Sequence, residues 1–219
     1  SVIFPEIAQA AATNGLASKV RAPGPCLPSK FLLEVETAYL PAGILSSAAY
    51  LARWGEFAKS LGCHSIRVDC RSKGNRAEVK KQAIDGLHQL CEILEPMKVN
   101  AIVENHGNWS SRGDWVKEVM SLVKRGNCGT LPDFGNFRDY DKYQGVKDML
   151  PWAKAICAKV HEINSDGEAA HTDFARMLKI LKQGGFKGFI GIEFEGAADP
   201  VSGVLKTKEL IEKTLRKLG

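Results

Sequence analysis

The sequence predicts an α/β barrel, and three observations support this fold class. Beyond Leu45, apolar segments typical of buried strands alternate with segments of helical periodicity, and the connections between them are short. Four successive predicted strands carry a polar side chain at the carboxyl end. In a barrel all strand ends point toward one axis, whereas an open sheet forms its site at a single switch point, so four such strands favour a barrel. The glycine-rich fingerprint of dinucleotide-binding sheets follows none of the early strands. We therefore expect one domain over residues 1–219, a (β/α)8 TIM barrel whose first part, 1–44, is irregular or compressed.

Length and composition agree with this expectation. A chain of 219 residues with 44% apolar content can fill one large core. It has no apolar run of about eighteen residues, so no membrane span is expected. The six cysteines form no CxxC pair and are expected to be buried free thiols, which fits a reducing compartment. The net charge of +5 is spread along predicted helices as on solvated faces, so nucleic acid is not an expected partner.

The first residues lack the charged start and long apolar core of an export signal, which predicts a cytoplasmic protein. Because the chain does not begin with Met, export after removal of a presequence is the alternative. Residues 4–12 fit a short helix ended by an Asn-Gly pair, and 21–29 contain three prolines and must be irregular. Residues 31–39 fit a strand or a helix, and we favour a strand in the first half. Little chain remains for the strands that precede His64, so the barrel wall near the N-terminus should be thin or open.

From Ser46 onward the elements follow in a regular order. Ser46 or Ser47 is a typical N-cap of the next helix, which Gly62 ends, and a glycine pair at 184–185 ends a later one. The intervening strands are short apolar or alternating segments, and the helices repeat apolar residues at helical spacing. The expected strands are 64–70, 99–105, 129–133, 155–161 and 189–194. The expected helices are 46–61, 77–94, 114–123, 145–153, 173–183 and 202–218.

Strand alternation assigns the side chains to two faces. The apolar side chains Ile66, Val68, Ile156, Val160, Ile190 and Ile192 should face the surrounding helices. The inner face then carries Arg67, Asp69, Lys159, His161, Gly191 and Glu193. Ionised side chains are seldom buried without partners, so this face should hold either a network of ion pairs or a metal site.

Glu104, Asp133, His161 and Glu193 are the polar residues at the four strand ends. Three carboxylates and one imidazole suit one divalent ion, Mn²⁺, Mg²⁺, Co²⁺ or Zn²⁺, with positions left for water and substrate. The alternative is that Glu104 and Glu193 are only paired with Arg67 and Lys159. The agreement of four strand ends favours the metal site.

Four motifs occur in the same order on the successive strands: ENHG at 104–107, TLPDFGNF at 130–137, AKVHEIN at 158–164 and GIEFEG at 191–196. Together they resemble the xylose isomerase-like TIM barrels, and within them the sugar phosphate isomerase/epimerase group, from about Leu45 to the C-terminus. The resemblance implies a metal-dependent enzyme that acts on a small sugar or sugar phosphate, with a homodimer as one expected assembly.

By this resemblance, Glu104, Asp133, His161 and Glu193 match the metal ligands, and the two glutamates match the pair that moves the substrate proton. The reaction implied is proton abstraction next to a carbonyl through an enediolate. Two departures separate the chain from ketose 3-epimerases. Asn136 stands where they commonly have histidine, and Ser110 and Ser111 stand in a loop where they have another glutamate.

Five further residues are candidates for substrate binding: Arg67, His106, Trp109, Asn136 and Lys159. Arg67 could hold a phosphate, and Trp109 could stack on a sugar. Ion pairing of Arg67 with Asp69 or Glu104, and of Lys159 with Asp69 or Asp133, is the alternative for the two cations. His106 could equally be a loop histidine.

Three other functions remain open from the sequence. A keto-sugar or inosose dehydratase would share the site and the first proton abstraction. An apurinic endonuclease would share the fold, but that activity uses several metals and additional histidines, and the chain has five histidines in all. A non-catalytic sugar-binding barrel could also retain the metal-ligand residues.

Overall fold

The computed structural model describes residues 32–34, 44–70 and 74–218. The strands in these ranges are β1 Leu32–Glu34, β2 Ser65–Val68, β3 Asn100–Glu104, β4 Cys128–Leu131, β5 Ala155–Val160 and β6 Phe189–Phe194. The α-helices are α2 Ile44–Ser60, α3 Arg76–Leu94, α4 Gly113–Val123, α5 Lys142–Met149, α6 Phe174–Gln183 and α7 Pro200–Leu218. Across the described ranges, every helix is too short or too polar to cross a membrane.

The strands are parallel and follow the chain in order. β1 to β4 form one sheet, and β5 pairs with β6. Isolated parallel bridges, Thr130 with Ala153 and Asp133 with Cys157, join the β4 segment to β5. Parallel strands in sequence order, each followed by a helix, make the wall of an α/β barrel and bring their carboxyl ends to one side.

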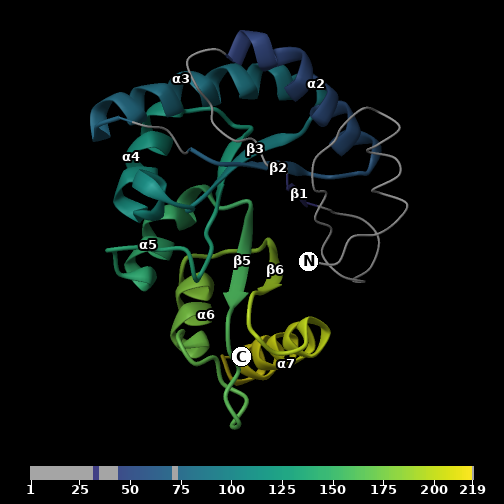
Figure 1. Cartoon of the computed structure of the whole chain (residues 1–219), viewed down its shortest axis with the longest axis vertical. Coiled ribbons are helices and arrows are strands. Elements are labelled where there is room, and N and C mark those ends of the chain that lie inside the picture. Colours follow the sequence, from purple (N-terminus) through teal and green to yellow (C-terminus); the bar gives the residue numbers. More distant parts are fainter. Residues whose placement is uncertain (1–31, 35–43, 71–73, 219) are drawn as a thin grey trace.

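Helices cover the outer face of this wall. Each helix from α2 onward contacts the next one along the chain, and Figure 1 shows α2 to α6 following one another along one side of the strands. Ile66 and Val68 pack in the core beneath α2, α3 and α4, and Ile156 and Val160 pack with residues of α6 and α7. Alternate strand residues form a small inner core, which contains Ile102, Leu131, Ala155 and Cys157. The predicted division of the strands into two faces is confirmed.

The element boundaries differ from prediction where capping residues set them. α3 starts at Arg76 because the Asn75 side chain accepts hydrogen bonds from the Ala77 and Glu78 amides, and Glu78 completes a capping box. α5 starts at Lys142, three residues earlier than expected, because Asp141 Oδ1 accepts a hydrogen bond from the Gln144 amide at 2.7 Å. It is followed by a 3-10 turn, Leu150–Trp152, which has proline near its start.

The N-terminal predictions are tested only in part. The strand expected in the first half of 31–39 is present as β1, which pairs with β2. The expected helix at 4–12 and the irregular stretch at 21–29 lie outside the described residues.

Candidate active site

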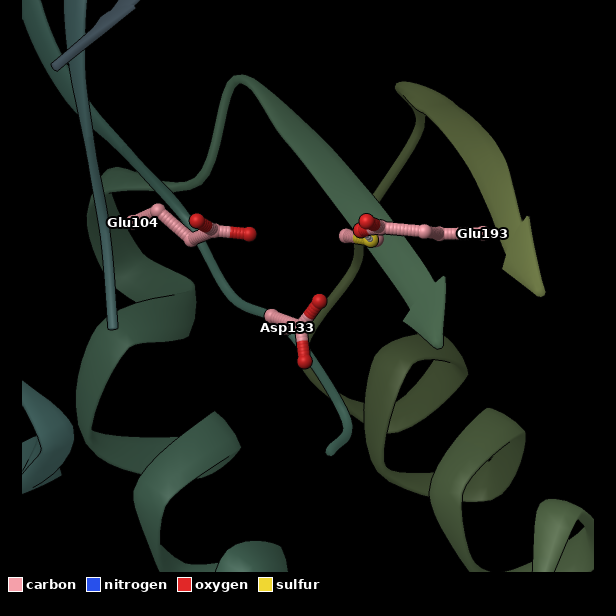
Figure 2. A group of neighbouring side chains, drawn as sticks. Glu104, Asp133 and Glu193 are labelled. Atoms are coloured by element: carbon pink, nitrogen blue, oxygen red, sulfur yellow. Dashed lines mark hydrogen bonds between the residues drawn. The ribbon is translucent and has the colours of Figure 1, made fainter. Parts of the chain in front are cut away.

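Three carboxylates of the predicted set meet inside the barrel. Glu104 ends β3, Asp133 follows β4 by two residues, and Glu193 lies in β6. Figure 2 shows the side chains of Glu104 and Glu193 extending toward each other, with Asp133 lying between them. One oxygen from each carboxylate and the Cys157 Sγ all lie within 4.8 Å of one another. Glu104 and Asp133 are 1% and 0% exposed, so these are buried charges that need compensation.

Hydrogen bonds fix the backbone of Asp133 and one of its two carboxylate oxygens, Oδ1. Its N–H donates to Asn105 Oδ1 at 2.7 Å, and its carbonyl accepts from Asn105 Nδ2 at 3.0 Å. Its Oδ1 accepts from the amides of Gly135 and Asn136, at 2.7 and 2.9 Å. Its Oδ2 is buried and accepts no hydrogen bond from the described residues. Burial raises the pKa of Asp133 to about 6, although the nearby Lys159 ammonium acts in the opposite direction.

Asn105 is a positioning residue that the sequence reasoning missed. We expect Asn105→Ala to lower the free energy of unfolding by about 1–3 kcal/mol, because it leaves a buried N–H and a buried carbonyl of Asp133 without their partners. Urea unfolding monitored by circular dichroism measures this. Asn164→Ala is the control, since Asn164 is exposed and should change stability by less than about 0.5 kcal/mol. Equal stability of the two variants would contradict the role given to Asn105.

Two buried cations lie beside the carboxylates. The Lys159 Nζ is 3.9 Å from Asp133 Oδ2, 3.4 Å from Glu193 Oε2 and 3.2 Å from Glu195 Oε1. Burial alone would lower the pKa of Lys159, but the three carboxylates together raise it above its ordinary value, so the ammonium stays charged. Arg67 pairs with Glu104 and, at 3.1 Å, with Asp69. The expected ion pairing of both cations is therefore present, with Glu193 and Glu195 as additional partners of Lys159.

The carboxylates of this cluster are possible ligands of a metal ion. Arg67 and Lys159 face five carboxylates, those of Asp69, Glu104, Asp133, Glu193 and Glu195. Asp133 Oδ2 lacks a hydrogen-bond donor among the described residues. Carboxylate oxygens are ligands that suit a divalent ion.

The predicted imidazole ligand lies apart from this cluster. His161 follows directly after β5, is exposed, and is not a member of the carboxylate group. The group contains Cys157 instead, which lies on β5 two residues before Lys159 and is bridged to Asp133. Cys157 Sγ donates to Glu193 Oε2 at 3.3 Å, and burial first, then the surrounding carboxylates, raise the pKa of this thiol well above its ordinary value. Strand alternation could have identified Cys157, because it shares a face with Lys159 and His161.

The remaining candidates lie around the rim. His106 is half-buried, with its Nδ1 at 3.9 Å from Asp69 Oδ2, and it forms a second group of metal-capable residues with Asp69 and Glu104. Asn136 donates its backbone amide to Asp133, while its side-chain Nδ2 is buried without a hydrogen-bond partner in the described part of the chain. Trp109 packs against the core beneath α3 and α4 and donates to the Gly74 carbonyl at 3.5 Å.

The sequence model of the xylose isomerase-like TIM barrel family matches residues 6–218. The chain belongs to this family. The xylose isomerase-like barrel accounts for the parallel strands in chain order, and a barrel of this kind carries its site at the carboxyl ends of the strands. Glu104 and Asp133 lie at such ends, in agreement with the fold class predicted from the sequence.

Solved structures share this barrel. A D-tagatose 3-epimerase-like protein superposes with a TM-score of 0.72 and 15% identity, over 99% of this chain and 86% of that one. An IOLI protein with a bound zinc atom gives a TM-score of 0.68 and 18% identity, over 87% of this chain and 77% of that one. These identities establish a common xylose isomerase-like fold.

A curated relative is also similar in sequence. The putative hydroxypyruvate isomerase of Mus musculus is 24% identical over 167 residues. The match covers 68% of this chain and 60% of that relative, so the chain spans less than two thirds of its length.

Proposed function

We propose that this chain is a divalent-metal-dependent sugar or sugar phosphate isomerase or epimerase, which moves a proton at a carbon next to a carbonyl. The observation that carries the proposal is the convergence of Glu104, Asp133 and Glu193 around a buried Asp133 oxygen that accepts no hydrogen bond from the described residues. The family supports it, because enzymes with a TIM barrel have their active sites at the carboxyl ends of the strands, and Glu104 and Asp133 lie at such ends.

The three carboxylates would hold the ion; the sequence predicts His161 as a fourth ligand, although the structure places its side chain outside the carboxylate group. A divalent ion bound there would polarise the substrate carbonyl and stabilise the negative charge that develops on its oxygen. The surrounding ion pairs keep the ligands in place: Arg67 holds Glu104, and Lys159 holds Glu193. The Asp133 side chain itself is shielded from solvent.

Glu104 and Glu193 are the proposed acid and base. They belong to strands β3 and β6, and their carboxylates extend toward each other across the cluster (Figure 2). A sugar carbon between them would be flanked by a carboxylate on either side. One carboxylate oxygen takes the proton from carbon, and the other residue returns a proton to the opposite face, which inverts that carbon. Return of the same proton to the neighbouring carbon gives an isomerase.

The relatives support this reaction class. One is a putative hydroxypyruvate isomerase and another is an epimerase-like protein, and both reaction types begin with removal of a proton next to a carbonyl. The zinc atom of the IOLI protein supports a metal in a barrel of this shape.

The experiment measures bound metal and proton exchange together. The purified protein is analysed for metal, and its exchange of substrate α-protons with deuterium from solvent is followed by NMR across ketoses, 3-keto sugars and their phosphates. We expect about one divalent ion per chain, loss of that ion in Asp133→Asn, and exchange that EDTA abolishes. Asp85→Asn is the control, because Asp85 is exposed on α3 and pairs only with Lys81 among the contacts described.

Each other outcome points away from the proposal. Bound metal with no exchange on any sugar would favour a non-catalytic sugar-binding barrel. Loss of water from the substrate would favour a dehydratase, and cleavage of abasic DNA would favour a nuclease. Unchanged metal content in Asp133→Asn would refute the assigned site.

A further inference from the structure

Helix α7 has apolar side chains on two opposite faces. Leu210 and Ile211 lie on its inner face and belong to the core with residues of β5 and α6. The outer face of a helix that covers a barrel is expected to be polar. Val201, Leu205 and Leu215 are nevertheless 58%, 55% and 44% exposed. They are three of the six large apolar side chains that are exposed in the described ranges, so exposed apolar surface is concentrated on this helix.

The exposed side chains form one stripe with the spacing of a coiled-coil seam. The stripe contains Val201, Leu205, Lys208, Glu212 and Leu215, which follow one another in alternating steps of four and three residues, and all five are exposed. Such steps keep side chains on one narrow line along a helix, against which a second helix can pack. Lys208 and Glu212 form an i, i+4 ion pair at 3.0 Å in the middle of the stripe. Figure 1 shows α7 at the periphery of the molecule, where a second molecule could reach it.

The stripe is complementary to itself when two copies of α7 run antiparallel. Leu210 lies midway between Leu205 and Leu215, and also midway between Lys208 and Glu212. A two-fold axis at the level of Leu210 therefore places Leu205 of one copy opposite Leu215 of the other, and Lys208 opposite Glu212. A parallel pair would place each charged residue opposite its own copy, and like charges in contact are unfavourable. The charge pattern thus selects the antiparallel arrangement.

We propose that this stripe binds the same stripe of a second copy of the chain, in an antiparallel two-helix contact around a two-fold axis. Such a contact uses one surface on both copies and closes at two subunits. A leucine pair lies at each end of the contact, and two lysine–glutamate pairs form between the copies at its centre. A helix of 19 residues is about 28 Å long, so the contact belongs to the small, reversible class of interfaces. The inference is independent of the metal site and of the reaction.

Analytical ultracentrifugation of the full chain tests the contact. We expect a monomer–dimer equilibrium that shifts toward the dimer as the protein concentration rises. Leu205→Glu and Leu215→Glu should each raise the dissociation constant by about tenfold or more, because the two-fold axis brings every substituted side chain into the contact twice. Leu122→Glu is the matched control: Leu122 is 51% exposed on α4, and its variant should dimerise like the unmodified protein.

Exchange of the central charges tests the antiparallel arrangement. Lys208→Glu and Glu212→Lys each place like charges opposite each other in a dimer of the variant, so each variant alone should favour the monomer. A mixture of the two variants should dimerise again, because every central contact then joins a lysine to a glutamate. Lys81→Glu is the control, since Lys81 forms a similar exposed i, i+4 pair with Asp85 on α3, and its variant should leave the dimer unchanged.

A measurement on the unmodified sequence guards against variants that fail to fold. A carbodiimide joins a lysine amine to a carboxylate without adding a spacer. Applied to a mixture of unlabelled and heavy-isotope-labelled protein, it should give mixed-isotope peptides in which Lys208 is linked to Glu212. Mixed-isotope peptides can only arise between two copies of the chain, so they are distinguished from links within one helix.

The remaining outcomes overturn the inference. A protein that is monomeric at every concentration excludes a second copy as the occupant of the stripe and leaves the stripe to a different protein. A dimer that Leu205→Glu and Leu215→Glu leave intact lies on another surface. A dimer that both leucine variants weaken, but that the mixed charge variants do not restore, contradicts the antiparallel pairing.

Discussion

Glutamine in place of Glu104 or Glu193 is expected to slow exchange of the substrate α-proton by about two to four powers of ten. Glutamine preserves the size of the side chain and one oxygen that can bind a metal, but it cannot accept a proton at neutral pH. The metal affinity should therefore fall much less than the rate. The measurement is deuterium incorporation from solvent, with bound metal determined on the same samples.

Glu195→Gln is the matched control for these variants. Glu195 also pairs with Lys159, at 3.2 Å, but it is not a member of the metal-capable group. Its variant should exchange at a rate within a few-fold of the unmodified protein. If Glu104→Gln and Glu193→Gln both exchange as fast as Glu195→Gln with metal bound, the two glutamates are ligands only. The base would then be sought at His106.

Lys159→Met should lower the free energy of unfolding more than the other substitutions considered, Asn105→Ala included. The side chain of Lys159 is 4% exposed, and its ammonium is the cation nearest to Asp133 Oδ2 among the contacts described. Removing one partner of a buried charge pair leaves uncompensated charge and typically costs about 3–5 kcal/mol. Urea unfolding of the metal-free protein measures this loss. Because a bound divalent ion would replace part of the lost positive charge and stabilises the folded state by mass action, Zn²⁺ should restore some of it.

Lys81→Met provides the comparison, since Lys81 forms an exposed i, i+4 pair with Asp85 on α3. Such pairs contribute about 0.3–0.5 kcal/mol. A Lys159→Met protein as stable as Lys81→Met would mean that the carboxylates are compensated by something other than this lysine. Equal losses with and without zinc would argue against a metal beside Asp133.

The fold was predictable because its main signals are local. The alternation of apolar and polar residues in 155–161 and 189–194 gives the two faces of β5 and β6, and the structure confirms the division at Ile156 and Val160. Helix starts were less accurate, because Asn75 and Asp141 form caps through contacts that a periodicity count ignores.

The candidate site was predictable in part. Alternation shows which side chains point inward, and so it selected Glu104, Asp133 and Glu193. It does not give the height of each side chain along the barrel axis, because the stagger between neighbouring strands sets that height. The sequence therefore placed His161 beside the carboxylates, whereas the register of β4 and β5 sets Cys157 beside Asp133. The Asn105 contact was missed because its partner is a backbone 28 residues away.

The hydrogen bonds of the Asn105 side chain couple the positions of Glu104 and Asp133. Its side chain presents a carbonyl and an N–H to the backbone of Asp133, which is how a neighbouring peptide group would pair with it. The Asn105 side chain thus adds one more pair of hydrogen bonds between the β3 and β4 segments, beyond Leu131, which is the last regularly paired residue of β4. Glu104 and Asn105 are adjacent in the chain, so a displacement of β3 carries both acidic groups, Glu104 and Asp133, in the same direction. Thermal motion of β3 and β4 would then change the distance between the Glu104 and Asp133 carboxylates less than if each residue lay on a separate loop.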